Sequence, residues 1–202
     1  MKDREISLLV EEVNEFCLNA SIKGFHYTRA IPEQILKLGL TCRTGEEIRF
    51  NFIKDYGHLF SKTELQIIRD KWASQFDQRQ QQSRDNYIFF NFTTSALYNV
   101  GAEPLLLNFG GEQIYMPFYE CDNISSILKD LGSPMILKCN LDPGFLNTFS
   151  EYPWGKIAVS SYHTMCNPEA CRVDQDGYKS VDVHSNQIEI LLYDSIKDFS
   201  RI

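Results

Sequence analysis

No stretch of the 202-residue chain approaches the ~18 consecutive apolar residues that a membrane-spanning helix needs. The first five residues, Met1-Lys2-Asp3-Arg4-Glu5, include two acids, and no long apolar core follows them. The sequence therefore predicts neither a membrane span nor a signal peptide. We expect a soluble protein that folds in a reducing compartment, the cytoplasm.

The chain also lacks an excess of positive charge. Its 20 Lys and Arg residues face 27 Asp and Glu residues, which gives a formal net charge of -7. A phosphate backbone would on average be repelled, so a nucleic-acid partner is disfavoured, although a local basic patch would reverse this. The hydrophobic content of 43% is ordinary for a globular protein, and a chain of this length can bury a core. We expect one domain over residues 1–202, with no internal repeat.

Among the six cysteines there is no Cys-x-x-Cys pair. His163, Cys166 and Cys171 form H-x-x-C-x-x-x-x-C, which could hold zinc with His184 as a fourth ligand. Because this spacing is loose and the segment is rich in turn residues, we favour a polar loop and no metal.

The first part of the chain predicts helices around one short strand, Phe25–Thr28. Residues 44–60 show no clear period, and the polar residues 78–84 look solvated or mobile, within a helical excursion over 50–85. The expected helices are an amphipathic one within residues 1–20, one from Pro32 to a C-capping Gly39, and one over 61–76 opened by a Ser61–Glu64 capping box.

From Asn86 onward the pattern changes to strands. The nearly continuous apolar run Tyr87–Phe92 predicts a strand buried on both faces. Helices first and strands later, with short links, predict an α+β fold with a mostly antiparallel sheet. The remaining expectations are a hairpin of 105–109 and 113–116 around Gly110-Gly111, a helix over 124–131, and strands over 134–141, 157–162, 178–183 and 187–193.

The last of these strands carries a candidate catalytic pair. Ile188, Ile190 and Leu192 alternate with other residues and predict one apolar face. Gln187 and Glu189, two residues apart, would then project from the opposite side. The amide could orient a target and the carboxylate could stabilise positive charge, although an edge strand facing water explains the same pattern.

Two further motifs carry candidate binding residues. In the first, His26 and Thr28 share one face of a strand, where an imidazole can donate to a ribose hydroxyl and a hydroxyl can bond an amide. In the second, Thr93-Thr94-Ser95 follows the buried strand and could brace a carboxylate, and Tyr98 could stack on a planar ring. Taken singly, a structural hydrogen bond, a strand-end cap and a core aromatic explain these residues equally well.

Together the motifs resemble those of ADP-ribosyltransferases. The H-x-T element with a downstream I-x-x-x-G-L (Ile35, Gly39-Leu40) is similar to the first strand and helix of DNA-targeting ADP-ribosyltransferase toxins and RNA 2'-phosphotransferases. T-T-S is similar to the S-T-S element of the protein-modifying toxins, and Q-x-E-I-L-L is similar to their E/Q-x-E signature. The chain mixes two patterns, because the toxin branch has an arginine on the first strand, where this chain has His26 and, three residues later, Arg29.

The resemblance implies the ADP-ribosyltransferase type of fold and a toxin- or effector-like enzyme, acting in the cytoplasm or delivered into that of a host. It implies NAD as co-substrate, no metal, and transfer of ADP-ribose to a macromolecular acceptor, protein more than nucleic acid, with an inhibitory partner allowed for. Glu189 would stabilise the oxocarbenium-like cation that forms as nicotinamide leaves, and Gln187 would orient the acceptor. The implied cofactor-binding residues are His26, Tyr27, Thr28, Arg29, Thr93, Thr94, Ser95 and Tyr98.

Three alternatives stay open. Glu112, in Gly110-Gly111-Glu112, is a rival carboxylate unless it only forms a hairpin turn. The chain could instead be a non-catalytic interaction module on the same fold, which predicts an exposed apolar patch and no NAD consumption. It could also be a hydrolase or thiol enzyme built on His163 and Cys166, which predicts inhibition by thiol alkylation.

Overall fold

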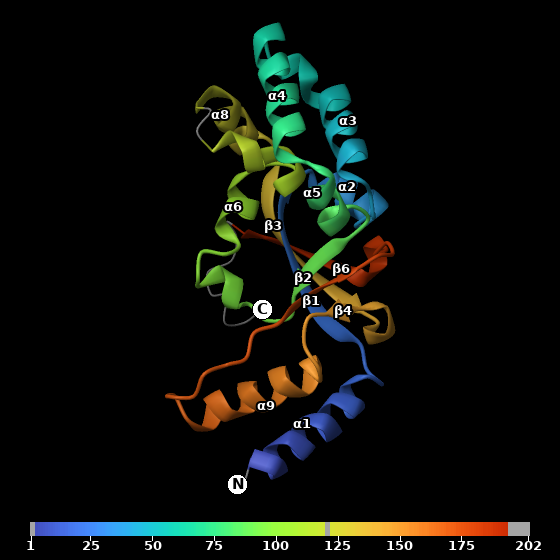
Figure 1. Ribbon diagram of the computed structural model, residues 1–202, viewed down its shortest axis with the longest axis vertical. Coiled ribbons are helices and arrows are strands. Elements are labelled where there is room, and N and C mark those ends of the chain that lie inside the picture. The colour runs from blue at the N-terminus through green and yellow to red at the C-terminus, as the bar shows by residue number, and fades with distance from the viewer. Residues whose placement is uncertain (1–2, 120–121, 194–202) are drawn as a thin grey trace.

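A computed structural model describes residues 3–119 and 122–193 (Figure 1). Within these ranges the chain forms one six-stranded sheet in the order β4-β5-β2-β1-β3-β6, and every pairing is antiparallel. The α+β prediction with an antiparallel sheet is therefore confirmed. The strands are β1 Ile22–Ala30, β2 Ile88–Asn91, β3 Ser133–Leu141, β4 Asn147–Thr148, β5 Asp176–Lys179 and β6 Ile188–Leu192.

Helices occupy most of the remaining described chain, and none of those in the described ranges is long and apolar enough to cross a bilayer. The α-helices are α1 Asp3–Cys17, α2 Pro32–Leu38, α3 Gly45–Tyr56, α4 Lys62–Gln75, α5 Gln78–Arg84, α6 Glu103–Leu107, α7 Glu112–Tyr115, α8 Asp122–Asp130 and α9 Pro153–Cys166. The 3-10 helices are η1 Gly57–Leu59, η2 Ser95–Leu97, η3 Met116–Phe118, η4 Pro143–Phe145 and η5 Ser185–Gln187.

Four expected helices are present at the predicted places. α1, α2, α4 and α8 lie where amphipathic spacing and end signals predict them. At the start of α4 the Ser61 hydroxyl accepts from the backbone N–H of Glu64, while the Glu64 carboxylate accepts from that of Ser61 at 2.8 Å. A second capping box, of Thr44 and Glu47, begins α3, so the segment that shows no clear period is helical.

Two expected elements are wrong. Within the expected helical excursion over 50–85, the polar segment 78–84 is the helix α5, which the Asp77 carboxylate caps by accepting from the backbone N–H of Gln80. The expected hairpin at 105–116 is the pair α6 and α7: Gly110 and Gly111, with φ of 83° and 73°, make a sharp turn that leads into a helix. The expected strand at 157–162 lies inside α9.

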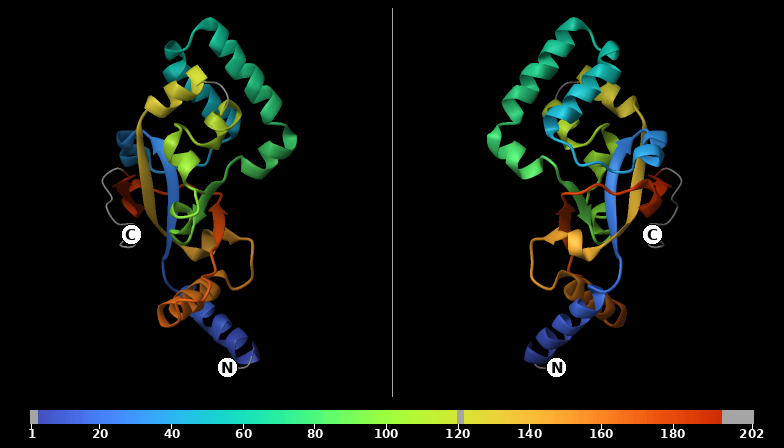
Figure 2. Two further views of the ribbon diagram at one scale, coloured as in Figure 1. Left: turned by 90° about the vertical axis from the view of Figure 1, so that its left-hand side faces the viewer. Right: turned by 90° about the vertical axis from the view of Figure 1, so that its right-hand side faces the viewer.

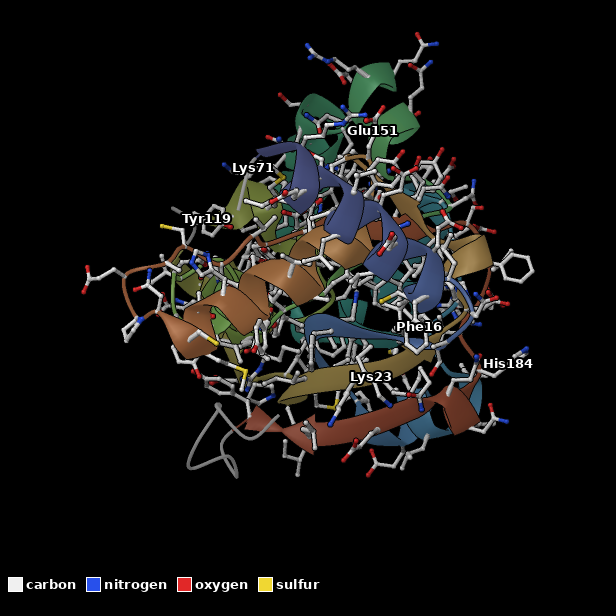
Figure 3. The ribbon with its side chains drawn as sticks, turned by 90° about the horizontal axis from the view of Figure 1, so that it is seen from below. Phe16, Lys23, Lys71, Tyr119, Glu151 and His184 are labelled. Atoms are coloured by element: carbon white, nitrogen blue, oxygen red, sulfur yellow. The ribbon has the colours of Figure 1, made fainter. Side chains whose placement is uncertain are left out.

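The helices form two groups at opposite ends of the sheet (Figures 1 and 2). At one end α3, α4, α7 and α8 enclose an aromatic core, in which the Trp72 indole donates to the carbonyl of Ile114 at 3.0 Å. At the other end α1 and α9 pack side by side (Figure 3). A third group, α6 and η2, covers one face of the sheet over Phe25 and Tyr27.

The contact between α1 and α9 is unusually close. A Cβ atom on Gly155 would lie 1.9 Å from the carbonyl oxygen of Val10. The buried Asn14 side chain accepts from the backbone N–H groups of Trp154 and Gly155 at 3.1 and 3.3 Å. α1 thus caps the first turn of α9 from across the interface, where α9 has no side-chain cap of its own.

Strand register determines which side chains share a face. Phe25 lies opposite Lys138, and Lys138 lies opposite Glu189, so these three project from one face of the sheet. His26, one residue along β1, projects from the other face. β1 pairs with β3 along its whole length, but its registered pairing with β2 is limited to Phe25 and Asn91. The two strands at the centre of the sheet therefore separate beyond that pair.

Candidate functional site

A cavity of about 350 Å³ opens where β1 and β2 separate. Its walls come from segments far apart in the sequence, which only the folded sheet brings together. They include residues 25–28 of β1, residues 87–91 at β2, residues 110–113 before and within α7, and Leu40, Thr41, Arg43, Arg84 and Asp176.

His26 is held in one orientation at this cavity. Its Nδ1 lies 2.9 Å from the carbonyl oxygen of Phe89, which can only accept, so Nδ1 carries the proton. The ring meets Phe90 edge to face at 6.0 Å. Burial lowers the pKa of His26 below its usual range, and the bond to Phe89 only partly opposes this. The imidazole is therefore neutral at pH 7, with Nε2 as an acceptor.

This lowered pKa predicts a pH dependence of stability. Below about pH 6.5 the unfolded chain protonates His26 while the folded protein does not. The free energy of unfolding should therefore fall as the pH drops through 6.5, and stop falling below the folded-state pKa. In His26→Gln this contribution should vanish, which urea unfolding at pH 7.5 and 5.0 would measure. His58→Gln, at an exposed histidine, is the control, and equal pH dependence in wild type and His26→Gln would contradict the assignment.

A charge pair lines the cavity. Arg84, at the end of α5, donates from Nη1 to the Glu112 carboxylate at the start of α7. The Nε of Arg84 also donates to the side chain of Gln80 at 2.9 Å. Arg43 and Asp176 complete the charged lining, so the cavity presents two guanidinium groups and two carboxylates.

The first motif of implied cofactor-binding residues, His26 to Arg29, lines the cavity with all of its residues except the last. His26, Tyr27 and Thr28 all line it. The buried Tyr27 donates its hydroxyl to the carbonyl of Thr93 at 3.5 Å, and burial raises its pKa. Arg29 does not line the cavity, because its Nε donates to the carbonyl of Leu131 at 2.7 Å.

The second motif, Thr93-Thr94-Ser95, does not line the cavity. Thr93 is only 2% exposed, and its hydroxyl bonds to the Asp174 carboxylate and to the Ser95 hydroxyl, 2.9 Å away. The motif therefore positions a carboxylate, as expected, but this carboxylate is Asp174 and not Glu189. Thr94 directly precedes η2, and Tyr98, 63% exposed, does not line the cavity.

The structure does not bring Gln187 and Glu189 to His26. Gln187 lies in η5, before the strand, where its Nε2 donates to the carbonyl of Asn140 at 3.2 Å. The expectation that both residues project from one side of a strand is therefore wrong. Glu189 lies on the edge strand β6 with its side chain 61% exposed, pairs with Lys138 at 3.7 Å, and projects from the face opposite to His26.

Sequence reasoning missed three charged residues of the cavity. Arg84 ends a glutamine-rich stretch that looked solvated, Asp176 follows a polar loop, and Arg43 lies in a segment without a period. No spacing in the sequence connects them, because the sheet alone brings these segments together. Of the charged lining the sequence indicates only Glu112, as the rival carboxylate, and it lies at the cavity and not in a hairpin turn.

The histidine and cysteine residues elsewhere do not converge. Over residues 3–119 and 122–193 no group of three or more His, Cys, Asp or Glu side chains is placed to hold a metal ion. His163 and Cys166 are exposed on α9, Cys171 is exposed in the following loop, and Cys121 lies outside the described residues.

Comparison with protein-family models, curated proteins and solved structures found no match to this chain.

Proposed function

We propose that the protein is an NAD-dependent ADP-ribosyltransferase whose active site is the cavity between β1 and β2. It transfers ADP-ribose to a macromolecular acceptor and releases nicotinamide. One observation carries the proposal: the separation of β1 from β2 places His26 and Thr28, both residues of the H-x-T motif, in the wall of one cavity with guanidinium and carboxylate groups.

The lining suits the parts of a dinucleotide. Guanidinium groups bind phosphate oxygens through paired hydrogen bonds, which gives Arg43 and Arg84 the diphosphate as a ligand. Nε2 of His26 accepts from a ribose hydroxyl, and a volume of about 350 Å³ is within the range of small-molecule sites.

We assign the role first given to Glu189 to Glu112. Cleavage of the bond between ribose and nicotinamide builds positive charge on the sugar, which a nearby carboxylate stabilises. The Glu112 carboxylate lies at the cavity against Arg84. When Arg84 turns to the diphosphate, the Glu112 charge becomes available to the sugar. Asp176 is the second carboxylate of the lining and provides the comparison for this assignment.

The acceptor that we favour is a protein, because the net charge of -7 repels nucleic acid on average. A toxin- or effector-like role, held in check by an inhibitory partner, fits such an activity. The hydrolase alternative lacks support, because His163 and Cys166 lie on an exposed helix surface. The interaction-module alternative has one observation in its favour, the exposed Phe16 and Met165 at the α1–α9 end (Phe16 is labelled in Figure 3).

The test of the function is incubation of the purified protein with NAD labelled in its adenylate phosphate, together with a cell lysate. We expect nicotinamide release and label in material that protease, but not nuclease, removes. A Cys166→Ser variant should be as active as wild type, which separates this activity from thiol chemistry. If the folded protein neither binds millimolar NAD nor consumes it in lysates, the proposal is wrong. The non-catalytic interaction module would then be the favoured function.

A further inference from the structure

α1 carries a stripe of apolar side chains that α9 leaves largely open. Ile6, Leu9, Val13 and Phe16 recur at intervals of three and four residues and therefore lie along one side of the helix. Asn14, which bonds to the first turn of α9, points in another direction. Ile6 and Leu9 are each 38% exposed, and Phe16 is 77% exposed. Most of the stripe therefore lies outside the contact between α1 and α9.

The stripe lies at an accessible end of the molecule. α1 and α9 project beyond the sheet (Figure 2), and Phe16 is labelled at this end in Figure 3. From Ile6 to Phe16 the stripe is about 15 Å long at the rise per residue of an α-helix. Single exposed apolar side chains are ordinary on protein surfaces, but a row of them at helical spacing indicates a surface that another element covers. Tyr162 and Met165 of α9 are also exposed and add apolar surface at the same end.

Glutamates border the stripe along one side. Glu5 precedes Leu9 by four residues, and so lies beside it on the helix surface. Glu12 stands in the same relation to Phe16. Within α1 four glutamates are exposed, whereas Arg4 is its one basic residue. The apolar stripe is therefore flanked by negative charge.

The negative charge continues at the start of α9. The hydroxyl of Tyr152, which directly precedes this helix, donates to the Glu11 carboxylate at 3.4 Å. The charge of Glu11, and further those of Glu151 and Glu15, raise the pKa of Tyr152. These carboxylates attract a positively charged partner to this end of the molecule.

A second copy of this chain does not suit the stripe. Its own α1 would bring the same glutamates to the contact, and like charges along the border of two apolar stripes repel each other. The formal net charge of -7 adds a long-range repulsion between copies. The stripe therefore fits a partner of opposite charge.

A basic amphipathic helix matches both features of this surface. Its apolar side chains at positions i, i+3, i+4 and i+7 would cover the stripe, which is a common way for helical segments to be recognised. Its Lys and Arg side chains would pair with the bordering glutamates. We propose that the α1–α9 end is the docking surface for a basic amphipathic helix of a partner protein. This surface is remote from the cavity between β1 and β2, so docking and NAD chemistry can each fail without the other.

Fluorescence anisotropy with two labelled synthetic helices tests the proposal. Each peptide is three heptads long, about 21 residues, with leucine at positions a and d and either lysine (Leu/Lys peptide) or glutamate (Leu/Glu peptide) at e and g. We expect saturable binding of the Leu/Lys peptide, at least tenfold tighter than that of the Leu/Glu peptide. The preference should shrink as salt is added, because exposed charges are screened. No binding of the Leu/Lys peptide at submillimolar protein, or equal affinity for the two peptides, would overturn the proposal.

The variant Leu9→Gln/Phe16→Gln tests the apolar stripe. It should weaken binding of the Leu/Lys peptide at least tenfold, because it removes the apolar surface to be buried. Leu36→Gln/Phe50→Gln is the matched control, at side chains of α2 and α3 that are 62% and 69% exposed, and should bind as wild type does. Undiminished binding in Leu9→Gln/Phe16→Gln would show only a general attraction of a cationic peptide to an acidic protein, and would overturn the proposal. If that variant does not fold, Phe16→Gln alone should lose at least threefold in affinity, and wild-type affinity there would have the same meaning.

The variant Glu5→Lys/Glu12→Lys tests the charged border. The ratio of the affinities for the Leu/Lys and Leu/Glu peptides should fall at least tenfold. Asp55→Lys/Asp130→Lys makes the same change of net charge on α3 and α8, at the opposite end of the sheet, and should change the ratio less than threefold. Equal losses in the two variants would mean that net charge alone sets the preference, which contradicts a defined docking surface.

Analytical ultracentrifugation separates this partner from a second copy of the chain. Wild type and Leu9→Gln/Phe16→Gln should sediment alike, because the stripe is not an interface between copies. A wild-type dimer that the variant dissociates would assign the stripe to a second copy and overturn the proposal.

Discussion

Glu112→Gln is expected to lower the rate of nicotinamide release about 100- to 1,000-fold, the typical effect of removing one electrostatic group aimed at transition-state charge. The amide keeps the shape of the carboxylate but has no charge to offer the oxocarbenium-like sugar. NAD affinity should change much less, because Arg84 is released to the diphosphate when its partner loses its charge. Single-turnover nicotinamide release and equilibrium NAD titration measure the two quantities separately.

The matched control is Asp176→Asn, the same change of charge in the same cavity. We expect it to lose less than tenfold in rate. If Asp176→Asn abolishes release while Glu112→Gln does not, the carboxylate assignment moves to Asp176 and the function stands. If both variants keep wild-type rates, the cavity is not the site of bond cleavage. Glu189→Gln should be active at the wild-type level, because Glu189 lies on the opposite face of the sheet from His26.

Gly155→Ala is expected to separate α1 from α9. A methyl group there would overlap the carbonyl oxygen of Val10, which lies 1.9 Å from its position. Since that oxygen belongs to backbone, one helix has to move, and the Asn14 cap of α9 is lost with it. Overpacking and loss of a cap together cost about 3 kcal/mol. Urea unfolding gives this difference, and limited proteolysis should cut within α1 of the variant before any cut in wild type.

Gly57→Ala is the matched control for this prediction. At Gly57 the backbone is helical, with φ of -58°, and an added Cβ would make only ordinary contacts, the nearest at 3.4 Å. The alanine should be neutral or slightly stabilising, because it restricts the unfolded chain. An equally resistant α1 in wild type and Gly155→Ala would show that the two helices are not closely packed in solution.

The elements that the sequence predicted correctly are those whose signals are local. The Ser61–Glu64 capping box and the acid-rich amphipathic α1 need no information from elsewhere in the chain. α9 was missed because its residues Ile157–Tyr162 have strand-like composition, and packing on α1 overrides that preference. Gly110-Gly111 supplies a sharp turn that serves a hairpin or a helix equally well.

For the candidate site, the sequence predicts only which residues of one strand share a face. The period of two correctly places His26 and Thr28 on one face of β1. It also places Glu189 on the opposite face of β6 from Ile188 and Ile190. It could not show that β6 is the edge strand beyond β3, nor that β2 leaves β1 after one pair, because strand order is a property of the whole sheet.

The hydrogen bonds from the first turn of α9 to the Asn14 side chain suggest when α1 and α9 pack together during folding. The two partners are 140 residues apart in the chain, and β1 and β3 lie between them. Closing so long a loop is entropically costly until the sheet has already drawn its ends together. We therefore expect α1 to pack on α9 late in folding, after β1 and β3 have paired.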